Sequence, residues 1–228
     1  QVSWDTSLLQ LFPEWQGQID THYYHKTLAD FLTHRAGVLP FTSGEEFATL
    51  PSFKGTLSEK RTAFGRFVLN QKPLLMPADS FLYSNAGYAI AALMLERATG
   101  MSWEILTKGL MDMLFLRYFI GFPNKEDQKL HAWGHLTETD ISTLLIPQSP
   151  KNGYKLPDFL APAGDIAMPI LDYAILTQQF LRGACGTNGL VSAQSFEHLL
   201  FGKPNYAFGW RNISQKNNQA VKIAFHDG

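Results

Sequence analysis

The sequence contains a single cysteine, Cys185, so no disulfide can form within the chain. It also lacks an uninterrupted apolar run near the ~20 residues that a helix needs to cross a bilayer. Neither sign of charge is in excess, because 19 basic and 20 acidic residues leave a formal net charge of −1. The balance of charge therefore gives no reason to expect nucleic acid or an anionic membrane surface as a partner. The lack of a long apolar run predicts that the chain has no transmembrane segment.

Two common enzyme signatures are also missing. The sequence has no Gly-x-Ser-x-Gly motif, which carries the nucleophile of α/β-hydrolases, and no glycine-rich phosphate-binding loop. These absences exclude the α/β-hydrolase and P-loop classes. The chain does have 228 residues, of which 45% are hydrophobic and 13% aromatic. That is enough for one sizeable core, or for one core with a smaller lobe.

The strongest local signal is Tyr83-Ser84-Asn85, which lies between a turn and an apolar helix. Residues 76–80 contain proline, aspartate and serine, which favour turns. Residues 86–98 are good helix formers with a broad apolar face, and Thr99-Gly100 ends them. Two interpretations stay open. Ser and Asn are preferred helix N-caps, but a fixed phenol, hydroxyl and carboxamide beside a buried helix could also transfer protons and hold a carbonyl substrate.

Other helices are predicted from caps and apolar spacing. Thr27, with Asp30 three residues later, resembles a capping box, and a short apolar helix follows it. The start of each remaining helix is marked by a cap, a proline or the beginning of apolar periodicity. These starts are residue 59, Ser102, Pro169 and Ser192.

Toward residue 228 the pattern changes from helical to alternating. Residues 206–210 alternate aromatic with smaller side chains, and residues 221–225 alternate in the same way after a polar turn. We expect a hairpin there, with His226 on the face opposite the apolar row. Residues 121–160 show no clear period, and a connection of that length is usually functional or mobile. Many helices followed by late strands predict an α+β fold.

A metal site is the main competing interpretation. His131 and His135 are four residues apart, with Glu138 and Asp140 nearby. However, Gly134 lies between the histidines, the segment lacks a helical period, and no His-Glu-x-x-His pattern occurs. The sequence therefore favours a solvated loop. For His34, the sequence favours a role in satisfying backbone groups at a helix end over a chemical role.

Five stretches occur in an order and spacing that one protein family shares. They are Phe31-Leu32-Thr33-His34-Arg35-Ala36-Gly37, Tyr83-Ser84-Asn85, Ala161-Pro162-Ala163-Gly164, Tyr206-Ala207-Phe208-Gly209-Trp210 and His226-Asp227-Gly228. Together they resemble the serine β-lactamase and penicillin-binding protein family, in the branch of class C β-lactamases, DD-peptidases and related esterases. The resemblance implies a β-lactamase/DD-peptidase-like fold. It would have a largely helical lobe and part of an antiparallel sheet, formed by one incomplete domain over residues 1–228.

The resemblance also implies roles for residues of this chain. Tyr83 would be the catalytic general base, with a neighbouring cation favouring its phenolate, because the reference pKa of a phenol is near ~10. Asn85 would orient the acyl side chain of the substrate, while Ser84 would act as a helix cap. His226 would stand where the family commonly has lysine. Histidine at this position fits esterases and peptidases better than β-lactam hydrolysis. Gly228 would keep the cleft open, since a Cβ there would intrude.

One part of the family pattern is absent. The family's nucleophile lies in a Ser-x-x-Lys motif, and no serine of residues 1–228 has lysine three positions later. We expect this motif to precede Gln1 and further strands to follow Gly228. On this interpretation the chain alone should not turn over substrate.

Three hypotheses follow from the resemblance. The first is a serine hydrolase that forms an acyl-enzyme on a small acyl substrate, which would be a D-amino-acid peptide, an ester or a β-lactam, without a cofactor or metal. The second is a non-catalytic relative that binds cell-wall peptides or a partner protein. The third is a proteolytic remnant. The family suggests the bacterial periplasm or cell envelope, although no targeting segment in the sequence supports that location.

Overall fold

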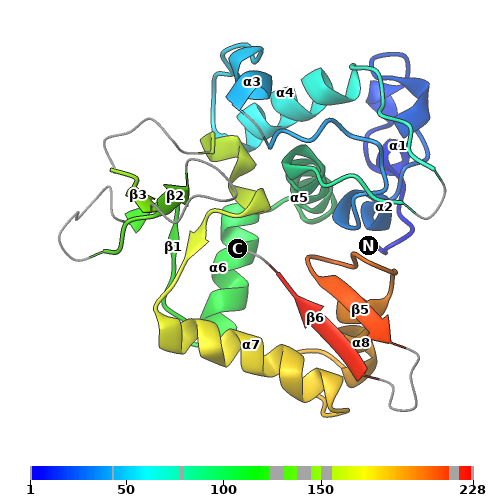
Figure 1. The fold of residues 1–228 in the computed structure, drawn as a ribbon. Helices are drawn as coiled ribbons and strands as arrows, with labels where there is room; N and C mark the ends of the chain where they lie inside the picture. The colour runs from blue at the N-terminus through cyan, green and yellow to red at the C-terminus, as the bar shows by residue number, and fades with distance from the viewer. Residues whose placement is uncertain are drawn as a thin grey trace.

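The protein is described by a computed structural model that covers residues 2–42, 44–77, 80–123, 131–137, 145–149, 156–215 and 221–226. Figure 1 shows the arrangement of its elements. The α-helices are α1 (Leu8–Leu11), α2 (Leu28–Leu32), α3 (Gly44–Ala48), α4 (Leu57–Leu69), α5 (Asn85–Thr99), α6 (Trp103–Met113), α7 (Ile170–Ala184) and α8 (Ala193–Phe201). Short 3-10 helices are η1 (Pro13–Trp15), η2 (Thr21–Tyr23) and η4 (Asp158–Ala163). The strands are β1 (Phe119–Ile120), β2 (His135–Thr137), β3 (Leu145–Pro147), β4 (Ile166–Ala167), β5 (Arg211–Gln215) and β6 (Val221–Phe225).

Helix α5 is the central helix of the core. It consists mainly of alanine and larger apolar residues, so most of its circumference has to be covered by other elements. It packs against α2, α4 and η4, as Figure 1 shows for its helical neighbours. Gly100 ends it in the left-handed conformation at a φ of 71°. The buried positions of α5 are Ala86, Gly87, Ala89, Ile90, Ala91, Ala92, Leu93, Met94 and Glu96. The prediction of a mostly buried helix is confirmed.

The predicted helix caps are also confirmed. Thr27 and Asp30 form a reciprocal capping box at the start of α2. The helix predicted from residue 59 begins two residues earlier, because Thr56 and Glu59 form a second capping box there. Serine side chains that accept a backbone N–H in the first turn begin α5, α6 and α8, and these residues are Ser84, Ser102 and Ser192.

The strand predicted at residues 206–210 is wrong. The chain turns there, with Asn205 at a φ of 66° and Gly209 at a φ of 90°, which are not strand conformations. Residues 206–208 are all buried. The alternation of aromatic residues therefore reflects the packing of a turn and not two faces of a sheet. The hairpin is formed by β5 and β6, which lie just after this turn.

Three antiparallel strand pairs occur in the described part of the chain, β1 with β4, β2 with β3, and β5 with β6. The pair of β2 and β3 lies within residues 121–160, where the sequence predicted a connection without a period, and β1 and β4 lie just before and just after it. Strands of two or three residues are too short to show alternation. Helices with small antiparallel sheets confirm the α+β prediction. No helix among the described residues is both long and apolar enough to span a membrane.

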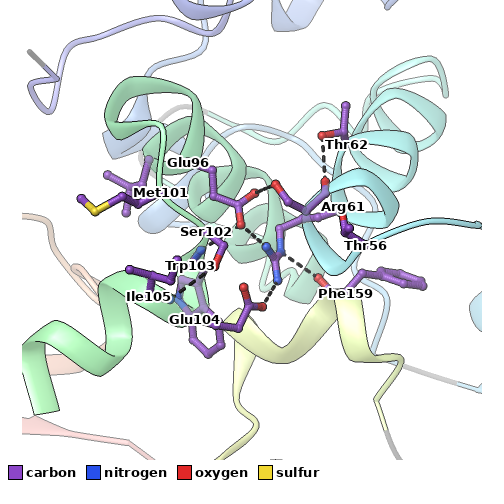
Figure 2. Close-up of polar contacts among 12 residues, drawn as sticks. Thr56, Arg61, Thr62, Glu96, Met101, Ser102, Trp103, Glu104, Ile105 and Phe159 are labelled. Atoms are coloured by element: carbon purple, nitrogen blue, oxygen red, sulfur yellow. Dashed lines mark hydrogen bonds and ion pairs between the residues drawn. The ribbon is translucent and has the colours of Figure 1, made fainter.

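A buried charged cluster joins α4, α5, α6 and η4 (Figure 2). The side chain of Arg61 in α4 has no exposed surface, and its guanidinium donates to Glu96 of α5. It also donates to Glu104 Oε1 of α6 at 2.7 Å and to the carbonyl oxygen of Phe159 at 3.2 Å. Burial would raise the pKa of Glu104, but hydrogen bonds from its own backbone and from Arg61 hold that pKa below its ordinary value. The cluster fixes α5 against its neighbours.

Two helical glycines give a matched test of the packing. A Cβ on Gly183 of α7 would lie 2.1 Å from the ring of Phe196 in α8, whereas a Cβ on Gly109 of α6 would meet no atom within 4 Å. We expect Gly183→Ala to lower the free energy of unfolding by about 1–3 kcal/mol through overpacking. Gly109→Ala should raise it by about 0.5–1 kcal/mol, because alanine loses less backbone entropy in a helix. Urea unfolding of both variants measures the difference, and a stabilised Gly183→Ala would contradict this packing.

Candidate active site

Tyr83 lies immediately before the N-cap of α5 and is half-buried. Its hydroxyl makes no hydrogen bond to any described residue. Burial raises the pKa of Tyr83, while the positive charge of Arg211 opposes that rise. Tyr83 is thus a phenol held in place by its surroundings, with its hydroxyl available for an external partner and with the charge of Arg211 opposing the rise in its pKa.

Ser84 and Asn85 have different local roles. Ser84 Oγ accepts the N–H of Gly87 at 3.0 Å and donates to the carbonyl oxygen of Leu39 at 2.7 Å. The N-cap interpretation is therefore confirmed for Ser84. Asn85 is the first residue of α5, and its Nδ2 donates to the carbonyl oxygen of Phe41 at 2.8 Å. This bond fixes the plane of the Asn85 carboxamide.

An aromatic cluster surrounds Tyr83. The ring of His34 lies 4.4 Å from the ring of Tyr83, 4.4 Å from that of Tyr206 and 5.2 Å from that of Tyr88, measured between centroids. The hydroxyl of Tyr88 donates to the carbonyl oxygen of Leu32 at 2.9 Å. Burial raises the pKa of Tyr206 to about 12. These rings come from three of the stretches that the sequence singled out, together with α5.

Arg35 joins two of those stretches directly. Its guanidinium donates to the carbonyl oxygen of Tyr206 at 2.9 Å and to that of Pro204 at 2.7 Å. The residue after His34 therefore holds the turn that carries Tyr206. In this way the loop after α2 and the turn before β5 are fixed on the same side of α5.

His226 follows β6 and is exposed. The register of the hairpin pairs Arg211 with Phe225, so Arg211 lies on the neighbouring strand beside His226. After burial, the charges of Arg35 and of both these residues contribute to the lowered pKa of His34. Asp227 and Gly228 lie outside the described residues, and so does the role predicted for Gly228. The sequence analysis missed Arg211, although a basic residue directly after the 206–210 motif was a possible signal.

A cavity of about 200 Å³ borders the site at His34 and Arg35. None of the predicted site residues Tyr83, Asn85 and His226 lines it. His22 and Lys26 contribute side chains to its wall. The cavity therefore lies beside the cluster and is not the space into which the Tyr83 hydroxyl opens.

The predicted loop histidines do not form a helical pair. His135 is the first residue of β2, and His131 lies in the coil before it, while Glu138 and Asp140 fall outside the described residues. Within the described ranges, no three His, Cys, Asp or Glu side chains are placed to hold a metal ion. The third family-like stretch, residues 161–164, lies at the end of η4, and η4 packs on α5.

Comparison with known proteins gives the family. The model of the Beta-lactamase family matches residues 1–211, and the chain belongs to this family. No curated protein sequence matches the chain. The family resemblance inferred from the five stretches is confirmed at this level.

Solved structures show the same fold. The octameric penicillin-binding protein homologue from Pyrococcus abyssi aligns with a TM-score of 0.63 and 20% identity, over 93% of this chain and 48% of its own. D-amino acid amidase from Ochrobactrum anthropi, complexed with L-phenylalanine amide, aligns with a TM-score of 0.64 and 17% identity. The alignment covers 99% of this chain and 62% of the amidase. A class C beta-lactamase mutant aligns with a TM-score of 0.63 and 16% identity, over 98% of this chain and 60% of the beta-lactamase.

These alignments are at low identity, so they show the fold alone. The chain spans 48% to 62% of the length of the three proteins. Beta-lactamases are hydrolases by name, so this chain belongs to a hydrolase family. Its own substrate and activity are matters for proposal.

Proposed function

We propose that the full-length protein containing this chain is a serine hydrolase that forms an acyl-enzyme on amide or ester substrates. The observation that carries the proposal is the environment of Tyr83. Its hydroxyl has no partner among the described residues, its ring is held in an aromatic cluster, and the charge of Arg211 opposes the rise that burial causes in its pKa. A proton acceptor needs a hydroxyl open to an external partner, a ring held in place and a nearby positive charge.

The reaction would proceed in two halves. The phenolate oxygen of Tyr83 takes the proton of the nucleophilic serine as the serine oxygen bonds to the substrate carbonyl carbon. Tyr83 then returns this proton to the leaving amine or alkoxide as its bond to that carbon breaks. In the second half Tyr83 takes a proton from water, the water oxygen attacks the acyl carbon, and the serine leaves with the proton. The nucleophile lies outside residues 1–228 on this proposal.

Four further residues would shape the substrate cleft. The Asn85 carboxamide, fixed through Phe41, would hydrogen-bond the acyl side chain. His226 would supply positive charge to the cleft only when protonated, and Arg211 beside it would supply charge at any working pH. Gly228 would leave room for the substrate. D-amino-acid amides, peptides and esters are the favoured class, which agrees with the D-amino acid amidase among the structural neighbours, and β-lactams are the other acyl donors to test.

The alternative is a non-catalytic relative or fragment that binds cell-wall peptides or a partner protein. The observation that favours it is the absence of a Ser-x-x-Lys motif from residues 1–228. The two candidates differ in covalent chemistry, because only the hydrolase forms a bond to its ligand.

Intact mass spectrometry tests the proposal. We expect the full-length protein, incubated with a penicillin or a p-nitrophenyl ester, to gain one acyl group, and p-nitrophenol to be released in turnover. D-phenylalanine amide and L-phenylalanine amide form a matched pair for the stereochemical preference. No added mass with any acyl donor, combined with reversible binding of a D-alanyl peptide, would favour the binding protein.

A further inference from the structure

His34 has several features that a simple packing residue does not need. It is 3% exposed, and its Nε2 is buried without a hydrogen-bond partner among the described residues. Its backbone has a φ of 59°, which is uncommon for a residue with a side chain. Buried polar atoms are nearly always bonded, and strained backbone persists where its surroundings require it. The unbonded Nε2 and the positive φ both indicate that His34 has a role beyond packing.

His34 contacts the backbone on both sides of Tyr83. Its carbonyl oxygen accepts the N–H of Leu82 at 2.9 Å. Its ring Nδ1 accepts the N–H of Ser84 at 3.1 Å. The residue before and the residue after Tyr83 are thus bonded to one histidine about fifty positions earlier in the chain. This arrangement leaves the backbone of Tyr83 little freedom to rotate.

The ring of His34 also packs on the ring of Tyr83. Their centroids are 4.4 Å apart at an interplanar angle of 44°, and Tyr206 packs on both rings, 4.4 Å from His34 and 5.9 Å from Tyr83. The side chain and the backbone of Tyr83 are therefore fixed by the same residue.

The bond from Ser84 defines the protonation of His34. Because Nδ1 accepts a hydrogen bond, the ring proton lies on Nε2 and the imidazole is neutral. Burial lowers the pKa of His34 to about 3, and the charges of Arg35, His226 and Arg211 add to the effect. Tyr83, Tyr88 and Tyr206 face the ring on its other sides. The neutral ring keeps Nδ1 available as an acceptor throughout the working pH range.

We propose that His34 is a positioning residue for Tyr83, which holds the Tyr83 hydroxyl in its reactive place through the bonds to Leu82 and Ser84 and through ring packing. The role rests on the proposed function, since it concerns Tyr83 as the base. It requires an acceptor at Nδ1, and it requires a residue that tolerates a positive φ.

Two substitutions separate the acceptor from the backbone conformation. Both asparagine and glycine tolerate a positive φ, but only asparagine offers an oxygen near the place of Nδ1. In the full-length protein we expect His34→Gly to lower kcat about 100-fold and His34→Asn about 10-fold, with KM within about 3-fold of the parent value. In a Tyr83→Phe background His34→Gly should cost no more than about 2-fold further, because its effect acts through the phenol.

A readout that does not depend on turnover keeps this role separate from the proposed function. With 3-fluorotyrosine incorporated, the ¹⁹F resonance that disappears in Tyr83→Phe reports on the Tyr83 ring. It should broaden or shift in His34→Gly and move less in His34→Asn. If the parent protein shows no turnover, the proposed hydrolase fails, while the ¹⁹F spectra still decide the role of His34.

Three results would overturn the positioning role. The first is a Tyr83 resonance that His34→Gly leaves unchanged. The second is an equal loss of kcat in the two variants, and the third is the same loss of kcat in the Tyr83→Phe background as in the parent. If His34→Gly does not fold, His34→Asn replaces it. The roughly 10-fold loss of kcat expected for His34→Asn in the parent protein should then disappear in the Tyr83→Phe background.

Discussion

Replacing Tyr83 by phenylalanine in the full-length protein is expected to lower kcat by about 100- to 10,000-fold, with little change in KM. This is the range that general acid–base groups contribute. The substitution removes one oxygen that bonds to no described residue, so the aromatic packing with His34 and Tyr206 stays in place. Steady-state hydrolysis of a chromogenic ester or of a D-amino-acid amide measures the effect.

The control for this experiment is another buried tyrosine. Tyr23 has no exposed surface, and its hydroxyl donates to the carbonyl oxygen of Gly37 at 3.2 Å, outside the aromatic cluster. Tyr23→Phe should lower stability by about 1 kcal/mol, the usual value of a lost hydrogen bond, and leave kcat within about 2-fold. If Tyr83→Phe hydrolysed substrate as fast as the parent, the role of Tyr83 as the base would be wrong.

Replacing Arg61 by methionine is expected to lower the free energy of unfolding by about 3–5 kcal/mol, the usual cost of removing one partner from a buried ion pair. The variant leaves Glu96 with a side chain only 5% exposed, together with Glu104, without the cation between them. In a protein of this size the melting temperature should fall by roughly 6 to 20 °C, at about 2–4 °C per kcal/mol. Thermal and urea unfolding monitored by circular dichroism check the prediction.

A double variant and a surface variant complete the test. Arg61→Met combined with Glu96→Leu removes both buried charges, so it should lose less stability than the sum of the two single variants. Lys108→Ala removes an exposed ion pair with Asp112, in which the two side chains are 65% and 60% exposed. It should leave the melting temperature unchanged. If the double variant lost as much free energy of unfolding as the two single variants together, the loss would come from packing and not from an unpaired charge.

Local sequence features predicted α2 and the helices from α4 to α8 correctly, while the four-residue helix α1 was not predicted. The serine and threonine caps and the small apolar residues of α5 act within one or two turns, so their pattern is visible in the sequence. The wrong prediction of a strand at residues 206–210 also came from a local pattern. Aromatic residues that alternate along a strand also alternate in a buried turn, and only the backbone angles of Asn205 and Gly209 distinguish the two.

The candidate site could be predicted only in part. The sequence singled out four site residues, and all four assignments stay predictions: Tyr83, Asn85, His226 and Gly228. The contacts that surround them join residues far apart in the chain, such as the bond from Arg35 to the carbonyl oxygen of Tyr206 across 171 positions. Such contacts leave no local pattern. The position of Arg211 depends on the register of a hairpin whose first strand the sequence analysis misplaced.

The central place of α5 affects how the site would respond to heat. A helix covered on nearly all sides exposes its amides only when the whole domain opens, so its amide hydrogen exchange reports global unfolding. Tyr83 is attached to the first residue of that helix through Ser84. The base would therefore keep its place up to the temperature at which the domain melts, and heat inactivation would coincide with melting.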